Sequence, residues 1–337
     1  MAKNSDWLAL VTEETLEPEL KICDPHHHLW LDQSARVAPR YGFDEILADV
    51  SCGHNIVSTV FIECAAMYKA DGPEAMKPVG ETEFINGIAA ISASGNYGPA
   101  RIAAGIVGSV DLTLGSAVEP VLAAHIDAGG GRFRGIRHGV SWDACDELPD
   151  IRTKPGQYLL LNPDYRAGVA ELEKFNLSLE VWCYHPQIPD LTDLARALPG
   201  VTIILNHFGV PLGVGPYAGH ADEVFEKWQG DISALSECEN VMAKLGGINM
   251  PENGFNWHTQ PKPPNSEQLM QATRRYYEFT IETFGVDRCM FESNFPVDSV
   301  TCSYNILWNS FKRLTADYSA DEKAKLYHDN AARVYRL

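Results

Sequence analysis

Short runs of apolar residues recur along the chain, and segments in which apolar residues return every three or four positions separate most of them. The runs lie at 20–25, 56–63, 102–110, 133–140, 177–184, 201–206, 241–245 and 288–292. Runs of this length between polar loops predict buried strands, and the amphipathic segments predict helices. The helices are expected at 43–52, 81–95, 115–128, 163–175, 190–198, 220–236 and 266–284, and two more close the chain.

This alternation of strands and helices predicts an α/β fold with parallel strands joined by right-handed crossovers. Eight such units in about 315 residues fit a closed (β/α)8 TIM barrel better than an open doubly wound sheet. We expect one domain over residues 20–337, preceded by an acidic N-terminal arm at 1–19. The longest βα loops are expected at 66–80, 141–161 and 249–265.

Net charge, apolar runs and cysteine spacing limit which binding partners and cellular locations the sequence fits. The formal net charge of −18 disfavours nucleic acid and anionic membranes, because both attract basic surfaces. No apolar run approaches the ~20 residues that span a bilayer, and no signal-peptide pattern opens the chain. Eight scattered cysteines without a CxxC pair favour reduced thiols and a cytoplasmic location. The expected partner is a small-molecule substrate, and a homodimer is expected only because that assembly is common.

Ionisable and polar residues follow nearly every predicted strand, where TIM barrels place their active sites. The residues are Asp24, His26, His28, Glu63, Arg134, Arg137, His138, His185, Gln187, Asn206, His207, Lys244, Glu292, Asn294 and Asp298. A structural accident would not repeat at so many strand ends. The pattern therefore predicts an active site at the carboxyl end of the barrel.

The first strand carries the densest group, Asp24-Pro25-His26-His27-His28. Side chains alternate along a strand, so Asp24, His26 and His28 are expected on one face and His27 on the other. Two imidazoles on one face can bind a single small cation. The alternative is a polar strand end that binds nothing.

Other candidates also have structural alternatives. His185 precedes Pro186 and could simply begin a turn. Glu63 and Lys244 are either residues of the site mouth or members of internal ion pairs, because a buried charge needs a partner. One of Arg134 and Arg137 could clamp a substrate carboxylate through its planar guanidinium, or each could cap its strand.

Four segments, DPHHHLW, VWCYHPQ, ILNHFGVP and RCMFESNFPVD, resemble the TIM-barrel metal-dependent hydrolases of the amidohydrolase superfamily. The nearest branch, often labelled amidohydrolase 2, contains sugar-lactone and pyrone-dicarboxylate lactonases. The resemblance spans roughly residues 20–337. It implies a divalent metal, with zinc favoured, bound by His26, His28 and His185, and it implies His207 in the same site.

The chain departs from the family pattern at the last strand. The family expects Asp in a Ser-Asp-aromatic-Pro setting, and the sequence here is Ser293-Asn294-Phe295-Pro296. Asparagine cannot accept a proton from water, so Glu292, Asp298 or Asp24 is the candidate base. Related lactonases include members that work without metal, so histidines that polarise the substrate directly remain an alternative to the zinc site.

We therefore expect a hydrolase that opens a lactone carrying hydroxyl or carboxylate groups, by attack of water on the ring carbonyl. The candidate catalytic residues are Asp298, Glu292, Asn294 and His207. The candidate substrate contacts are Arg134, Arg137, Glu63, Gln187, Lys244, Asp24, Tyr68 and Trp257. A metal-dependent non-oxidative decarboxylase is the alternative enzyme, and a catalytically silent ligand-binding barrel is the alternative outside enzymes.

Overall fold

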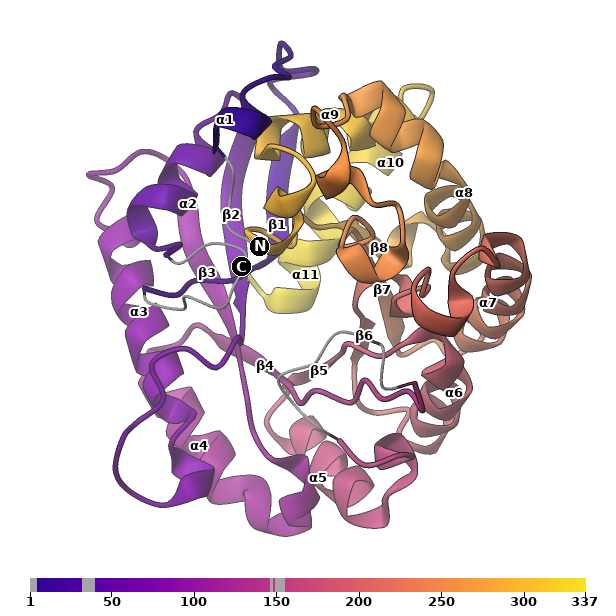
Figure 1. Cartoon of the computed structure of the whole chain (residues 1–337). Coiled ribbons are helices and arrows are strands. Elements are labelled where there is room, and N and C mark those ends of the chain that lie inside the picture. The colour runs from indigo at the N-terminus through magenta and orange to yellow at the C-terminus, as the bar shows by residue number, and fades with distance from the viewer. Residues whose placement is uncertain (1–4, 32–39, 146–147, 149–154) are drawn as a thin grey trace.

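Eight parallel strands form one sheet whose order follows the chain from β1 to β8 in the computed structural model (Figure 1). The structure describes residues 5–31, 40–145, 148 and 155–337. The strands are β1 (Lys21–His27), β2 (Asn55–Ile62), β3 (Arg101–Gly108), β4 (Phe133–Arg137), β5 (Ser178–Val181), β6 (Ile203–Leu205), β7 (Val241–Leu245) and β8 (Cys289–Phe291). The predicted (β/α)8 barrel is confirmed, and each strand overlaps its predicted run.

The barrel closes between β1 and the segment that follows β8. The Asn294 N–H donates to the His26 carbonyl at 2.9 Å, and the His28 N–H donates to the Phe295 carbonyl at 2.8 Å. These two bonds place the histidine-rich end of β1 directly beside residues 293–295. Sequence positions nearly 270 apart therefore meet at one end of the barrel.

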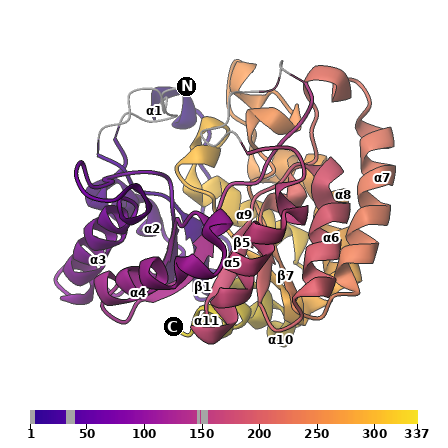
Figure 2. The ribbon, with the colours of Figure 1, turned by 90° about the horizontal axis from the view of Figure 1, so that it is seen from below.

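Helices pack around the strands, most of them on the outside of the barrel (Figures 1 and 2). They are α1 (Ser5–Leu8), α2 (Phe43–Val50), α3 (Val79–Ala93), α4 (Glu119–Ala128), α5 (Pro163–Lys174), α6 (Ile188–Ala197), α7 (Ala221–Ser236), α8 (Ser266–Phe284), α9 (Tyr304–Leu314), α10 (Ala320–Ala324) and α11 (Asn330–Tyr335). In the part of the chain that is described, no helix combines the length and apolarity required to cross a bilayer.

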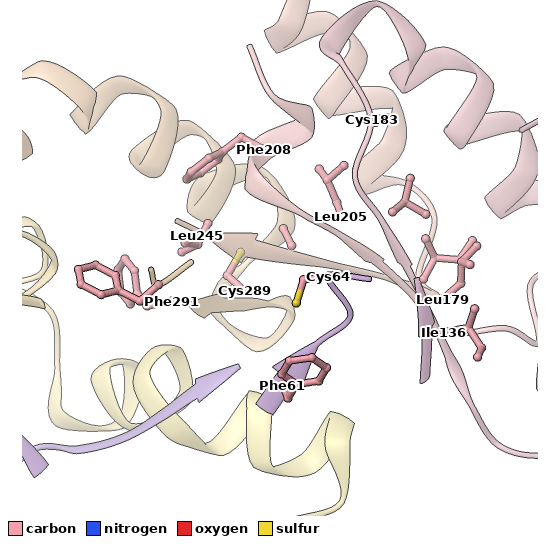
Figure 3. Close-up of a cluster of buried hydrophobic side chains, with 14 of the residues drawn as sticks. Phe61, Cys64, Ile136, Leu179, Cys183, Leu205, Phe208, Leu245, Cys289 and Phe291 are labelled. Carbon is pink, nitrogen blue, oxygen red and sulfur yellow. The ribbon is translucent and has the colours of Figure 1, made fainter. Parts of the chain in front are cut away.

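Strand side chains divide into an outer and an inner layer. The outer layer belongs to a large apolar cluster shared with the helices and includes Ile136, Leu179, Leu205, Leu245 and Phe291 (Figure 3). Next to each of these residues along the chain stands a buried polar residue: Arg137, Glu180, Asn206, Lys244 and Glu292. Because successive strand side chains face opposite sides of the sheet, these polar groups face the barrel interior.

The C-terminal helix closes the amino-terminal end of the barrel. Ala331 and Tyr335 of α11 join a second apolar cluster, which fills the interior with residues such as Val60, Ile204 and Met290. Arg134, the second residue of β4, donates through Nε to the Tyr335 carbonyl at 2.5 Å. The end of α11 therefore lies at the start of the strands, opposite the predicted active site.

The N-terminal segment packs against the helices that follow β7 and β8. Carboxylate oxygens of Glu13 accept hydrogen bonds from Ser266, at the start of α8, and from Asn309 of α9. The Lys312 ammonium donates to the carbonyls of Leu16 and Glu17 at 2.7 and 2.9 Å. Residues 13–17 thus link α8 to α9.

Candidate active site

A carboxylate and two imidazoles meet at the carboxyl end of the barrel. Oε2 of Glu292 lies 2.7 Å from Nδ1 of His26, and Oε1 lies 2.5 Å from Nδ1 of His207. His26 is the sixth residue of β1, while Glu292 and His207 follow β8 and β6 within two residues. All three side chains are at most 2% exposed. Their ligand atoms lie within 4.8 Å of one another, so they could hold one metal ion.

Two glycines after β7 make this approach possible. A Cβ atom on Gly246 would come within 2.5 Å of Cγ of Glu292, and one on Gly247 within 2.0 Å of Nδ1 of His207. Gly247 also has a φ of +67°, a conformation that side chains disfavour. The sequence Leu245-Gly246-Gly247 therefore leaves space that the imidazole and the glutamate occupy.

His28, the residue that follows β1, lies on the other side of the His26 ring. Nε2 of His28 is 3.3 Å from Nε2 of His26, and Nδ1 of His28 is 2.8 Å from the Ile62 carbonyl. Nη1 of Arg137 also lies 3.4 Å from Nε2 of His26. His26 and His28 thus share one face, as their spacing predicts. His27 instead contacts Thr59 of the neighbouring strand at 2.8 Å.

Two internal ion pairs flank the imidazoles. Nε of Arg137 donates to Glu63 at 2.9 Å, and the Lys244 ammonium lies 2.9 Å from Glu180. Both Glu63 and Lys244 are therefore members of internal ion pairs, one of the two alternatives that the sequence left open.

Glu292 has no close cationic partner among the described residues. The nearest ammonium or guanidinium nitrogen on any described residue is Nζ of Lys244, 3.9 Å from Oε2. Within the described ranges, no donor stands in hydrogen-bonding geometry to this buried oxygen. A buried carboxylate requires positive charge nearby. Two imidazole nitrogens and one carboxylate also form a ligand set typical of zinc, so these residues fit one cation.

Burial and neighbouring charges favour a neutral His26. Desolvation lowers its pKa well below the usual value, and the Lys244 ammonium lowers it further. A neutral imidazole retains a lone pair that can accept a proton or bind a metal.

Asn294, two residues after Glu292, binds a second carboxyl group. Its Nδ2 donates to Oδ1 of Asp298 at 2.9 Å. Burial raises the pKa of Asp298 to about 8, despite the opposing effect of the Asn294 hydrogen bond. Asp298 is therefore mostly protonated at neutral pH, which suits a proton donor better than a base.

A family model described as Amidohydrolase matches residues 23–337, nearly the whole barrel. The chain belongs to the amidohydrolase family. A relative from Sinorhizobium fredii, uncharacterized protein y4mH, is 31% identical and covers 95% of this chain and 99% of its own. The L-fucono-1,5-lactonase of Burkholderia multivorans is 26% identical and covers 71% of this chain and 73% of its own.

Solved structures share the fold of this amidohydrolase. An amidohydrolase from Burkholderia multivorans with bound zinc has a TM-score of 0.71 at 22% identity, covering 94% of this chain and 99% of its own. A 2,6-dihydroxybenzoate decarboxylase from Rhizobium has a TM-score of 0.53 at 16% identity, covering 94% and 98%. At these identities the likeness establishes the barrel architecture alone.

In this amidohydrolase the Asp24 carboxylate binds the backbone of His26, through the His26 N–H at 3.3 Å, and not the imidazoles. Its oxygens accept hydrogen bonds from the Ser293 N–H at 2.9 Å and from the Tyr304 hydroxyl at 2.9 Å. The β1–β2 pairing shifts register between Asp24 and His27, and that irregularity breaks the strict alternation assumed from the sequence. The prediction that Asp24 shares a face with His26 is therefore wrong, and its hydrogen bonds are structural.

His185 is also placed away from the cluster. The Leu212 N–H donates to its Nδ1 at 3.3 Å, and its ring packs edge-on against Tyr217 at 5.0 Å. A surface pocket of about 300 Å³ lies between His185 and the start of α7. The chain turns into a short 3-10 helix at His185–Gln187, and the buried ring lies against the segment that precedes α7. In this structure His185 does not join His26 and His28 as the resemblance implies.

Gln187 and Arg134 bind the backbone instead of facing the cluster. The Gln187 side chain donates to the Val140 carbonyl and accepts from the N–H groups of Trp142 and Tyr184, so it joins two loops. Arg134 lies at the opposite end of β4 from Arg137 and binds carbonyls near the C-terminus. Of the two arginines, only Arg137 reaches the histidines.

The two aromatic candidates lie in the long loops. Tyr68 is 37% exposed. Trp257 is half-buried and stacks on Phe255 with 6.4 Å between the ring centroids. Contact of either ring with a substrate stays a prediction.

Sequence reasoning missed Glu180 and Tyr335, which lie beneath the histidines. The Glu180 carboxylate accepts hydrogen bonds from the Tyr335 hydroxyl and, at 2.5 Å, from Nδ2 of Asn206. A charged residue inside the short run Leu-Ser-Leu-Glu-Val was the available signal, since such a run is expected to be buried. No comparable pattern marks Tyr335, which reaches the barrel interior from the last helix.

Proposed function

We propose that this amidohydrolase opens the ring of a lactone with water. The observation that carries the proposal is the buried Glu292 carboxylate, placed between Nδ1 of His26 and Nδ1 of His207 and lacking a close cationic partner. This arrangement supplies a base beside groups that can bind a cation. The 26% identity to a fucono-lactonase supports the choice of a cyclic ester.

In this proposal Glu292 accepts the proton of the attacking water while the hydroxide adds to the ring carbonyl carbon. The bond between that carbon and the ring oxygen then breaks, and the protonated Glu292 returns its proton to the departing ring oxygen. The product is one open-chain hydroxy acid, and Glu292 is again an ionised carboxylate. Asn294 cannot perform this step, so Glu292 replaces the base that the family pattern places two residues later.

The remaining groups orient and polarise the substrate. The Arg137 guanidinium, fixed by Glu63, points one N–H group toward the Nε2 side of His26. From there it can stabilise negative charge on the carbonyl oxygen as water adds. A zinc ion held by His26, His207 and Glu292 would add Lewis-acid polarisation of the carbonyl and make the attacking water more acidic.

A decarboxylase of the same family is the second candidate. Arg137 and Lys244 stand on opposite sides of the His26 ring, 3.4 Å from Nε2 and Nδ1 respectively. Arg137 could bind a substrate carboxylate there. Loss of CO2 leaves a carbanion that needs a proton, and the raised pKa of Asp298 makes it a candidate donor.

Two substrate panels separate these functions. Aldonolactones, including L-fucono-1,5-lactone, would be assayed by acid release, and hydroxybenzoates by CO2 release. We expect acid release only, with Glu292→Gln reducing kcat at least about a hundredfold. Glu278→Gln, at a partly exposed position of α8 where the side chain pairs with Arg274, is the matched control and should keep wild-type rates. CO2 release would favour the decarboxylase, and no turnover on either panel would favour a ligand-binding barrel.

A further inference from the structure

A buried ion pair forms the floor of the candidate metal site. The Lys244 ammonium lies 2.9 Å from Oε2 of Glu180 and donates to the Pro25 carbonyl at 2.8 Å. The same nitrogen is 3.4 Å from Nδ1 of His26 and 3.9 Å from Oε2 of Glu292. Lys244 therefore approaches two of the three candidate ligand atoms, and both members of the pair are fully buried.

Glu180 is fixed on its other side by the rest of the barrel. The hydroxyl of Tyr335 donates to Oε1, and Nδ2 of Asn206 donates to Oε2. The Lys244 ammonium also lies 5.4 Å from the centre of the Tyr335 ring. Since strands β5 and β7 and helix α11 all contribute, neither charge can move away without breaking several contacts.

We propose that the Glu180–Lys244 pair sets the affinity of the His26, His207 and Glu292 cluster for a divalent cation. The inference rests on the proposed function, because it takes this cluster to be the working site. Lys244 repels a cation bound at Nδ1 of His26, and Glu180 offsets that repulsion from the far side of the ammonium. The two residues contact no substrate in this scheme and act only through the charge they hold beneath the ligands.

The proposal requires opposite effects from removing the two charges. Glu180→Gln leaves the ammonium without its counter-charge, so the cluster becomes more positive and binds a cation more weakly. Lys244→Met leaves the carboxylate without its counter-charge, so the cluster becomes more negative and binds a cation more tightly. A residue pair that merely supports the fold would weaken binding in both variants.

The test is titration of chelator-treated protein with zinc in competition with a chromophoric chelator. We expect the zinc dissociation constant to rise at least about tenfold in Glu180→Gln and to fall at least about tenfold in Lys244→Met. The exposed Lys174→Met on α5 controls for the loss of a lysine and should bind zinc as the wild type does.

The double variant Glu180→Gln/Lys244→Met controls for misfolding of the single variants, because it leaves no buried charge unpaired. Its zinc affinity should return to within about threefold of the wild-type value, since removing one positive and one negative charge leaves the net charge beneath the ligands unchanged. Changes in the same direction in both single variants, a double variant far from wild type, or a wild type that binds no zinc would overturn the inference. Failure of the lactonase proposal can be distinguished from failure of this inference. In that case the protein would not turn over lactones, while the zinc dissociation constants would still change as expected here.

Discussion

Gly247 lies so close to the His207 ring that a Cβ atom there would come within 2.0 Å of Nδ1. Alanine at this position must therefore displace His207 from Glu292 or distort the backbone, which already has a positive φ. We expect Gly247→Ala to lower kcat/KM about a hundredfold, as misplacement of a catalytic group by about 1 Å does. Steady-state kinetics on the best lactone would measure the effect.

Gly230 in α7 provides the matched control for this prediction, because a Cβ there meets nothing within 4 Å. Gly230→Ala should keep kcat/KM and raise stability by roughly 0.5–1 kcal/mol. Equal activity in Gly247→Ala and Gly230→Ala would show that the position of His207 does not govern the reaction.

The buried Asp298 should make stability depend on pH. Its pKa in the folded protein is about 8, above the ordinary value of 3.8, so the folded state holds the proton more tightly. Its contribution to the free energy of unfolding is full below about pH 4 and is lost as pH rises toward 8. Asp298→Asn removes this dependence. Between pH 4 and 8, the free energy of unfolding of the metal-free variant should therefore rise by at least about 1 kcal/mol relative to that of the wild type.

Urea unfolding of metal-free protein at several pH values would measure this gain. Asp71→Asn, at an exposed loop position, should follow the wild-type pH curve. Parallel curves for wild type and Asp298→Asn would mean that Asp298 is ionised in the folded protein at neutral pH.

The two arginines of β4 should respond differently to the same substitution. Arg137→Lys loses the planar arrangement that joins Glu63 and points toward His26, so kcat/KM should fall at least about tenfold. Arg134→Lys loses backbone hydrogen bonds at the other end of the barrel, so it should lower the melting temperature and change kcat/KM less than about twofold. A larger kinetic effect from Arg134→Lys would contradict the placement of the substrate near Arg137.

Metal content gives the most direct test of the histidines. We expect about one zinc per chain in purified wild-type protein by elemental analysis, and its loss from His26→Ala/His28→Ala. His185→Ala should retain the metal, because its ring packs against Tyr217 outside the cluster. If wild-type turnover instead resists chelators and no metal is found, the imidazoles polarise the substrate directly.

The strand pattern and the strand-end residues were readable from the sequence, because burial imposes apolar runs and parallel strands bring their carboxyl ends together. That reasoning brought His26, His207 and Glu292 into one site. It left three carboxylates open as the base, since spacing alone cannot show that Asp24 binds Tyr304 or that Asp298 binds Asn294.

Side-chain direction beyond the strand ends was less predictable. His185 comes four residues after the end of β5, where a 3-10 turn rather than strand alternation decides which way the ring points. Arg134 and Arg137 are only three residues apart, yet at about 3.3 Å per residue that distance separates the two ends of a short strand. The role of Glu180 depends on partners on β7 and α11 that are distant in sequence, and no local sequence pattern identifies them.

The paired charges inside the barrel also constrain how this interior can evolve. Replacing one member of Glu63–Arg137 or Glu180–Lys244 leaves a buried charge that costs about 3–5 kcal/mol. A lineage would rarely survive such an intermediate, so positions 63 and 137, and positions 180 and 244, should change together or not at all. New substrate preferences in descendants of this protein should then arise mainly in the loops at the barrel mouth, while these four interior positions persist.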